Sequence, residues 1–390
     1  MSDAVLLSAC RTAVGTAGRG TLRETSAFDL ATVVVREAAH RSGLPPERID
    51  DVVLGETLAG GGDIARYAAI EAGLPHVPGL AQNRHCASGL TSIATAAAGV
   101  RSGMEQAVIA GGTHSSSTAP VSRRRIPGTE EWDDPWSSPS HVPTPDAPNR
   151  DMSILVGWNT ARLAGVSRAE MDAWALRSHQ RAIRAIDEGR FAEEIIPVKV
   201  TNSEGAVSMF DLDEHPRRNT SPEKLAALTV LHPEIEDFSI TAGNSSGVND
   251  AAAAVLVADS GLAAHHGLTP LATIRSWASV GVDPVRTGFA PITAIRKALA
   301  RAGIDVDDVD LFEINEAFAS VAVATTRELG LDESRVNPFG SGCSLGHPIA
   351  ATGARMVTTL AHELRRRGGG TAVAAMCAGG GMGSAMVLSA

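Results

Sequence analysis

Residues 34–57, VVREAAHRSGLPPERIDDVVLGET, align without a gap with residues 294–317, AIRKALARAGIDVDDVDLFEINEA. Each stretch reads as the end of an amphipathic helix, a glycine suited to a helix C-cap and a short apolar strand. A second, looser match sets the helix after Gly89 against the helix after Gly353, and each precedes a strand that ends in Ala-Gly-Gly. Two matches in the same order predict two duplicated α/β halves that face each other. The identical pairs of the first match are Arg36 and Arg296, Ala38 and Ala298, Arg41 and Arg301, Gly43 and Gly303, Asp50 and Asp310, and Glu56 and Glu316.

The rest of the pattern agrees with an α/β fold. Short apolar runs such as residues 49–54 and 107–110 alternate with helical periodicity at residues 28–42 and 89–101. This alternation predicts helices layered on a largely parallel sheet. Residues 115–149 are rich in Pro, Ser and charge, and we interpret the middle stretch to about residue 241 as an insertion over the functional site.

Chain length, net charge and cysteine content indicate the compartment of the protein and exclude some classes of partner. At 390 residues the chain is long enough for two or three packed units, and its net charge of −10 argues against nucleic acid or an anionic membrane as a partner. Four cysteines make no disulfide framework and no zinc-knuckle spacing. The first residues show no signal-peptide pattern, and no apolar run reaches membrane-spanning length. We expect a reducing, cytoplasmic location.

Cys86 stands in AQNRHCASGL, just before a predicted helix. The unpaired N–H groups and positive dipole end of a helix N-terminus favour thiolate over thiol, so we predict a nucleophile. His347, in SLGHPIAATGAR, stands at the junction that the duplication makes the counterpart of the one bearing Cys86, with Pro348 suited to the first helical turn. A neutral imidazole there could accept the proton of Cys86. The alternatives are a buried structural cysteine and a histidine that caps its own loop.

Two further candidates stand at strand ends. Cys377 follows the strand TAVAAM and precedes a Gly run and another predicted strand, which does not fit a dinucleotide fingerprint. Such a turn lets the backbone approach a ligand closely, so the amide of Gly379 is a candidate oxyanion donor. Asn315 closes the repeat strand DLFEI, where ligands gather in such sheets. The alternatives are a chance buried cysteine and an asparagine that caps the next helix.

Five motifs resemble those of the thiolase family and follow the family's order across nearly the whole chain. The resemblance implies a duplicated thiolase-like fold, with two α/β halves in a layered αβαβα arrangement. It also implies an N-terminal half at residues 1–117 plus 248–267, a loop domain over the CoA site at residues 118–247, and a C-terminal half at residues 268–390. The motifs are N-x-x-C-x-S-G-L at residues 83–90, G-N-x-S-G-x-N-D at 243–250, N-E-A-F at 315–318, G-H-P at 346–348 and C-x-G-G-G-M-G at 377–383.

The resemblance also implies a chemistry. The family cleaves a 3-ketoacyl-CoA with CoA to acetyl-CoA and a shortened acyl-CoA, or runs the reverse Claisen condensation, through an acyl-cysteine. Cys86 is similar to the nucleophile, His347 to its base and Cys377 to the second acid/base. Asn315, through a water, would form one oxyanion hole with His347, and the amides of Cys86 and Gly379 would form the other.

Substrate contacts follow from the same resemblance. Ser246, Met152, Phe318 and, by a looser match, Arg217 are similar to residues near the bound acyl-CoA. CoA or an acyl-CoA is the partner as substrate, so no cofactor and no metal are implied. Homodimers and homotetramers are typical of the family.

This chain departs from the family around the acyl group. His85 precedes the nucleophile where the family usually has an apolar or small residue, and Asp-Met-Ser at residues 151–153 replaces His-Met-Gly. Thr287, beside Phe289, replaces a methionine that usually lines the acyl pocket. These departures favour a degradative enzyme with a non-standard acyl group over a biosynthetic acetoacetyl-CoA thiolase.

Other readings stay open at this point. A zinc-binding structural module would use Cys343 and His347, and a thiolase-like protein without turnover would bind CoA alone. A decarboxylating ketosynthase would pair its cysteine with His-His or His-Asn, whereas here Asn315 and His347 stand with a second cysteine, which favours a thiolase. A sterol-carrier-type thiolase would replace N-E-A-F with a histidine motif, which is absent.

Overall fold

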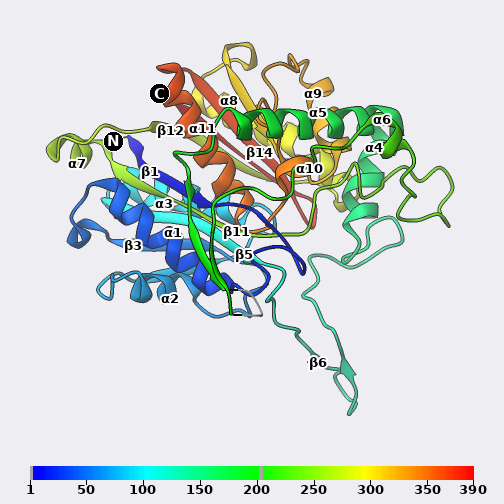
Figure 1. The fold of residues 1–390 in the computed structure, drawn as a ribbon, viewed down its shortest axis with the longest axis horizontal. Helices are drawn as coiled ribbons and strands as arrows, with labels where there is room; N and C mark the ends of the chain where they lie inside the picture. The colour runs from blue at the N-terminus through cyan, green and yellow to red at the C-terminus, as the bar shows by residue number, and fades with distance from the viewer. Residues whose placement is uncertain (1–2, 202–204) are drawn as a thin grey trace.

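One eleven-stranded sheet runs through the molecule in the order β13-β14-β15-β12-β1-β11-β5-β3-β4, with the short strands β2 and β8 beside it (Figure 1). The computed structural model describes residues 3–201 and 205–390. The sheet strands are β1 (Ala4–Thr12), β2 (Gly15–Thr16), β3 (Asp51–Gly55), β4 (Gly79–Gln82), β5 (Ala107–Ser115), β8 (Ile195–Ile196), β11 (Asn249–Asp259), β12 (Ala272–Gly281), β13 (Leu311–Ile314), β14 (Thr371–Ala378) and β15 (Met382–Ser389).

The two halves of this sheet and the helices packed on them form five layers. α3 and α11 contact each other and strands of both halves, so they lie in the middle layer. α1 and α2 cover the outer face of the first half, and α8 packs on β12 and β15 of the second. The predicted αβαβα arrangement of two α/β halves is confirmed. The helices are α1 (Ala27–Ser42), α2 (Ile64–Glu71), α3 (Ser88–Ser102), α4 (Asn159–Ala164), α5 (Arg168–Asp187), α6 (Pro222–Ala226), α7 (Ser260–His265), α8 (Ala290–Ala302), α9 (Ala319–Glu328), α10 (Gly342–Leu345) and α11 (Thr352–Arg367).

The repeat that predicted the fold has the same local structure in both copies. α1 ends at Gly43 with φ 72°, and α8 ends at Gly303 with φ 66°. This left-handed conformation suits glycine, and in each half it turns the chain back toward the sheet, where β3 or β13 follows. The two halves join between β1 and β12, where two residue pairs are in register.

The predicted parallel character of the sheet is wrong. The parallel pairings of the described residues are β3 with β4, β3 with β5, β13 with β14 and β1 with the short β8, whereas the other sheet pairings are antiparallel. Near the C-terminus, the antiparallel pairing of β14 and β15 follows from the tight turn through Gly380 and Gly381 that joins them. A tight turn can connect only antiparallel neighbours.

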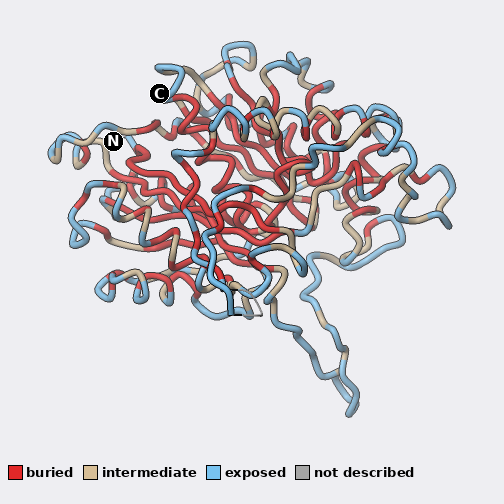
Figure 2. The backbone as a smooth tube through the Cα atoms, viewed as in Figure 1, coloured by how far each residue is buried: buried red, intermediate tan, exposed pale blue. Residues whose placement is uncertain are grey.

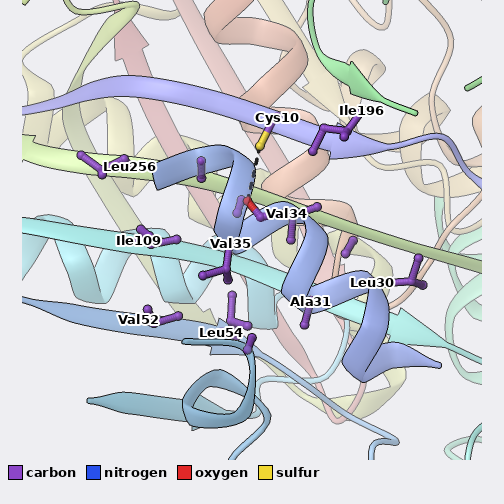
Figure 3. Close-up of a cluster of buried hydrophobic side chains, with 14 of the residues drawn as sticks. Cys10, Leu30, Ala31, Val34, Val35, Val52, Leu54, Ile109, Ile196 and Leu256 are labelled. Atoms are coloured by element: carbon purple, nitrogen blue, oxygen red, sulfur yellow. Dashed lines mark hydrogen bonds between the residues drawn. The ribbon is translucent and has the colours of Figure 1, made fainter. Parts of the chain in front are cut away.

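Apolar side chains fill the spaces between the layers. Figure 3 shows α1 lying across the first half of the sheet, with Leu30, Val34 and Val35 among the buried residues. Cys10 belongs to this outer core, and its thiol donates to the carbonyl oxygen of Val34. Burial raises the pKa of Cys10 to about 12, so this thiol stays protonated.

Apart from the short strand β8, the segment between β5 and β11 lies outside the sheet. Its first part carries β6 (Arg124–Arg125) and β7 (Trp132–Asp133) on a hairpin that projects from the body and is largely exposed (Figures 1 and 2). α4, α5 and α6 and the small sheet of β9 (Val198–Thr201) and β10 (Val207–Phe210) follow. The division into three domains stays a prediction. Among the described residues, no helix has both the length and the apolar character needed to cross a membrane.

Candidate active site

Cys86 lies at the start of α3, two residues before its first helical residue. Its Sγ faces its own backbone N–H and that of Gly379, and both hydrogen bonds lower the thiol pKa. Burial has the larger effect and raises the pKa of Cys86 to about 11. The predicted preference for thiolate is therefore wrong for this state, because desolvation outweighs the helix terminus. The resting Cys86 side chain is therefore a thiol.

Two glycines bring the start of α3 against the segment that carries His347. A Cβ on Gly89 would lie 2.6 Å from the carbonyl oxygen of Ala350, and a Cβ on Gly353 would lie 2.5 Å from the backbone nitrogen of Leu90. Neither distance is possible for a real side chain, so the two backbones touch only because both residues are glycine. The helix start predicted at Pro348 is wrong, since α11 begins at Thr352.

The imidazole of His347 is buried and held in one tautomer. The hydroxyl of Thr352 donates to the Pro348 carbonyl oxygen (3.0 Å), so it accepts from Nδ1–H of His347 (2.7 Å). Among the residues that the structure describes, Nε2 of His347 has no hydrogen-bond partner. Burial lowers the pKa of His347 to about 3. The ring is therefore neutral, with the lone pair of Nε2 free to accept a proton.

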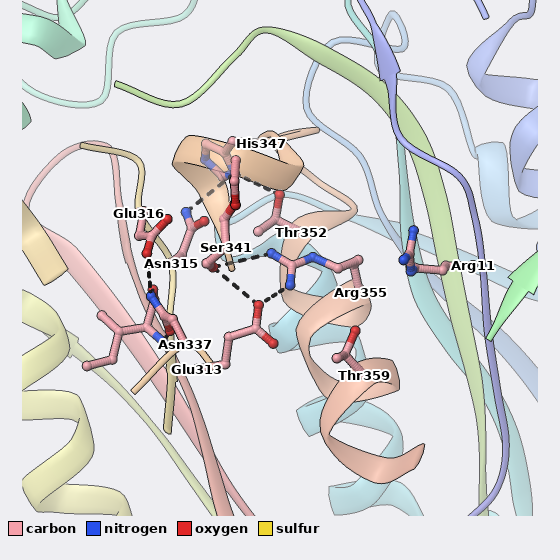
Figure 4. Close-up of polar contacts among 12 residues, drawn as sticks. Arg11, Glu313, Asn315, Glu316, Asn337, Ser341, His347, Thr352, Arg355 and Thr359 are labelled. Carbon is pink, nitrogen blue, oxygen red and sulfur yellow. Dashed lines mark hydrogen bonds and ion pairs between the residues drawn. The ribbon is translucent and has the colours of Figure 1, made fainter. Parts of the chain in front are cut away.

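Asn315 and Cys377 emerge at the same edge of the second half. β13 and β14 run in parallel with Ile314 opposite Ala375, and the N–H of Asn315 donates to the Ala375 carbonyl oxygen. Nδ2 of Asn315 lies 3.4 Å from Nδ1 of His347, as Figure 4 shows. The helix-capping alternative is wrong for Asn315, because the N-cap of α9 is Phe318. Burial, and then the neighbouring Cys86, raise the pKa of the Cys377 thiol.

The motif at residues 243–250 connects these parts. The N–H of Ser246 donates to the Ala317 carbonyl oxygen (2.9 Å). Oδ1 of Asn249 accepts from the N–H of His347 (3.0 Å), and its Nδ2 donates to the Gly15 carbonyl oxygen (3.0 Å). Sequence reasoning singled out neither Asn249 nor Thr352, although each stands within or next to a quoted motif. Both position His347 rather than react themselves.

The predicted substrate contacts fall in two places. Met152 approaches Gly379, whose N–H faces Cys86, and Phe318 packs against Gly157. Ser246 is partly exposed beside them. Arg217 is elsewhere, in a cavity of about 330 Å³ whose lining includes Arg218, Lys224, Gly243 and Cys343.

Two residues noted in the sequence, Thr287 and Cys343, have structural roles. Thr287 is fully buried, accepts from the N–H of Gly381 (3.1 Å) and donates to the Pro284 carbonyl oxygen (2.6 Å), so it fixes the glycine turn after Cys377. Cys343 is buried in α10, and its N–H donates to Glu316 (3.1 Å). Residues 3–201 and 205–390 contain no group of three or more His, Cys, Asp or Glu side chains arranged to hold a metal ion.

Comparison with known protein families agrees with this geometry. The family model of the thiolase N-terminal domain matches residues 4–261, and that of the thiolase C-terminal domain matches residues 268–390. The chain belongs to the thiolase family. The predicted family and the enzyme class, an acyltransferase, are thereby confirmed.

Individual thiolases resemble this one over their full length. An acetyl-CoA acetyltransferase of Syntrophomonas wolfei is 39% identical over 405 residues, covering 100% of this chain and 99% of the relative. A 3-ketoacyl-CoA thiolase of Bacillus subtilis is 39% identical, with 99% of each chain covered. The crystal structure of the Bacillus anthracis acetyl-CoA acetyltransferase superposes with a TM-score of 0.90 at 36% identity, covering 100% of this thiolase and 99% of that chain. Human mitochondrial 3-ketoacyl-CoA thiolase superposes with a TM-score of 0.90 at 35% identity, covering 99% and 98%.

Proposed function

We propose that this thiolase cleaves a 3-ketoacyl-CoA with CoA, through an acyl group carried on Cys86, and that it works in the degradative direction. One observation carries the proposal. Gly89 lies against Ala350, and Cys86 and His347 each stand three residues before this contact, which supports a shared site for the thiol and the neutral imidazole. Relatives named acetyl-CoA acetyltransferase and 3-ketoacyl-CoA thiolase support the substrate class.

The proposed first half-reaction uses two protein groups. Sγ of Cys86 attacks the 3-keto carbon while its proton moves to Nε2 of His347. The bond between C2 and C3 then breaks, which leaves an acyl thioester on Cys86 and a carbanion on acetyl-CoA. Cys377 protonates that carbanion. Its raised pKa suits this role, because a weakly acidic thiol can also remove the same proton in the reverse direction.

The proposed second half-reaction restores the thiol. The sulfur of CoA attacks the acyl carbon, and its proton returns through the same bases, so that Cys86 leaves as a thiol. The N–H groups of Cys86 and Gly379, which face Sγ, would stabilise the oxyanion of the acyl group. Asn315, through a water, would form the second oxyanion hole with His347. We propose no cofactor and no metal, because CoA enters as a substrate.

The CoA moiety would bind on the side of Ser246 and Arg217. Arg217, Arg218 and Lys224 place cationic groups around one cavity of a chain whose net charge is −10. Local positive charge of this kind suits the phosphates of CoA. We also propose a cytoplasmic location.

A homodimer or homotetramer is proposed from the exposed sheet edge. β4 is the terminal strand of the sheet, and Leu80 on it is 45% exposed, with Tyr67 and Ile70 of α2 also exposed. An open edge with apolar side chains favours pairing with another chain. Sedimentation equilibrium measures the assembly size directly.

Thiolysis by the purified wild-type protein tests the proposed function. Acetoacetyl-CoA and longer or branched 3-ketoacyl-CoAs are each mixed with CoA, and acetyl-CoA release is measured. Mass spectrometry of the protein incubated with substrate alone should find the acyl group on Cys86. A sharp preference for acetoacetyl-CoA would favour a biosynthetic enzyme instead, and absence of turnover with every substrate would reject the thiolase proposal.

The Arg217→Gln variant tests the CoA contact. We expect the KM for CoA to rise about fivefold to tenfold with kcat nearly unchanged, because a contact to a remote phosphate is made equally in the ground and transition states. Steady-state kinetics with varied CoA measures both constants. Arg296→Gln, an exposed arginine beside Glu328 on the second half, controls for loss of one charge. Equal KM values in the two variants would remove Arg217 from the CoA site.

A further inference from the structure

His85 holds an unusual backbone conformation directly before the nucleophile. Its φ is 47°, in the left-handed region. Its N–H donates to Oδ1 of Asn83 (2.8 Å), and its carbonyl oxygen accepts from the hydroxyl of Ser88 (2.7 Å). Both backbone groups are therefore used locally, and the backbone fixes the direction in which the imidazole leaves the chain.

The imidazole lies beside the groups that would surround the acyl carbon. A Cβ on Gly379 would lie 3.8 Å from Cγ of His85 and 3.9 Å from Sδ of Met152. The N–H of the same Gly379 faces Sγ of Cys86. His85, Cys86 and Met152 are all partly exposed, so a substrate can reach them.

Both ring nitrogens of His85 are available for hydrogen bonds with a substrate. In the part of the chain that the structure describes, neither ring nitrogen of His85 has a hydrogen-bond partner, and the hydrogen bonds of this residue are made by its backbone. Partial burial lowers the pKa of His85 below its usual value. The ring is therefore neutral at neutral pH and offers one donor and one acceptor. An apolar acyl chain against it would displace water from both nitrogens without replacing the hydrogen bonds.

The charged side chains next to this region already have partners. The guanidinium of Arg84 donates to the hydroxyls of Thr91 and Ser279. Oδ2 of Asp151, next to Met152, lies 2.8 Å from Nε2 of His232. The neutral ring of His85 itself supplies no positive charge to pair with a carboxylate on the substrate.

We propose that His85 is a specificity-determining residue that selects 3-ketoacyl-CoAs whose acyl group carries an uncharged hydrogen-bonding oxygen, such as a hydroxyl, ether or carbonyl. The inference rests on the proposed thiolysis at Cys86. It deepens that function by naming the class of acyl group, which is the part that moves onto the cysteine.

Two isosteric substrates test the proposal. 4-Methoxy-3-oxobutanoyl-CoA and 3-oxohexanoyl-CoA differ in one ether oxygen in place of a methylene group. Their kcat/KM values are measured for the wild type, His85→Leu and His85→Asn. Since the oxygen also changes the reactivity of the ketone, the measured quantity is the change in the ratio of the two values between proteins.

We expect the ratio of kcat/KM for the methoxy substrate to kcat/KM for the apolar substrate to fall about fivefold to tenfold in His85→Leu. This fall corresponds to the loss of one hydrogen bond. His85→Asn should keep at least half of the wild-type ratio, because asparagine tolerates the left-handed backbone and keeps a donor and an acceptor. 3-Oxoadipyl-CoA, with a terminal carboxylate, should be a poorer substrate than the methoxy compound for the wild type.

An equal fall for both substrates in His85→Leu would overturn the proposal, because it would indicate backbone strain at Cys86 rather than selection. Preference for 3-oxoadipyl-CoA would overturn the uncharged class. Both of these results require measurable turnover by the wild type. If the proposed function itself failed, all three substrates would stay uncleaved and no acyl group would be found on Cys86. The two failures are therefore distinguishable.

Discussion

The Cys86→Ala variant is expected to lose thiolysis by at least about 10⁴-fold, because covalent catalysis has no other nucleophile at this position. The variant should also form no acyl adduct with substrate, as measured by intact-protein mass spectrometry. Its thermal midpoint should stay close to that of the wild type, since the change removes a single sulfur atom from a partly exposed residue at the margin of the core.

Cys10→Ala is the matched control for this prediction. Cys10 is fully buried under α1 and donates only to the Val34 carbonyl oxygen. Its removal should leave kcat and the acyl adduct unchanged while lowering stability slightly. If Cys86→Ala kept activity within tenfold of the wild type, or if the adduct formed on another cysteine, the assignment of the nucleophile would fail.

The Arg355→Met variant is expected to lose about 3–5 kcal/mol of folding free energy, because it leaves the carboxylate of Glu313 buried without its partner. Arg355 of α11 is 2% exposed and forms an ion pair with Glu313 of β13, which is 3% exposed and also accepts from the hydroxyl of Ser341 (Figure 4). Urea denaturation followed by circular dichroism measures the change.

A double variant separates pairing from packing. Glu313→Met combined with Arg355→Met should recover most of the lost stability, because apolar groups of similar volume replace a buried ion pair at little net cost. Arg365→Met, which breaks an exposed pair with Glu193, should change stability by less than about 1 kcal/mol. A double variant no more stable than Arg355→Met would show that packing rather than the unpaired charge causes the loss.

The internal repeat made much of the fold predictable. Helix, left-handed glycine and strand recur at Gly43 and Gly303 because this order depends on local propensity and periodicity. Strand direction in the centre of the sheet was not predictable in the same way. It depends on which strands the long middle segment separates, and this leaves no periodic signal in the chain, whereas the glycine run before β15 did indicate a turn between two strands.

The positions of the candidate site residues at segment ends were predictable, but their protonation states were not. Cys86 stands at a helix start as expected, yet burial raises its pKa to about 11, and burial is a property of distant segments that fold over it. The partners that orient His347 show the same limit. Asn249 is separated from it by almost a hundred positions, so only the folded chain reveals the hydrogen bond.

The crossing of Gly89 and Gly353 has a consequence for how this protein family can vary. The approach of these two segments is set by main chain lying on main chain, with no side chain as a spacer. A single methyl group at either position would push the segments apart by a large fraction of the length over which a proton can be passed. The selection that we propose for His85 acts from outside this contact, so the acyl group could change without moving the two segments.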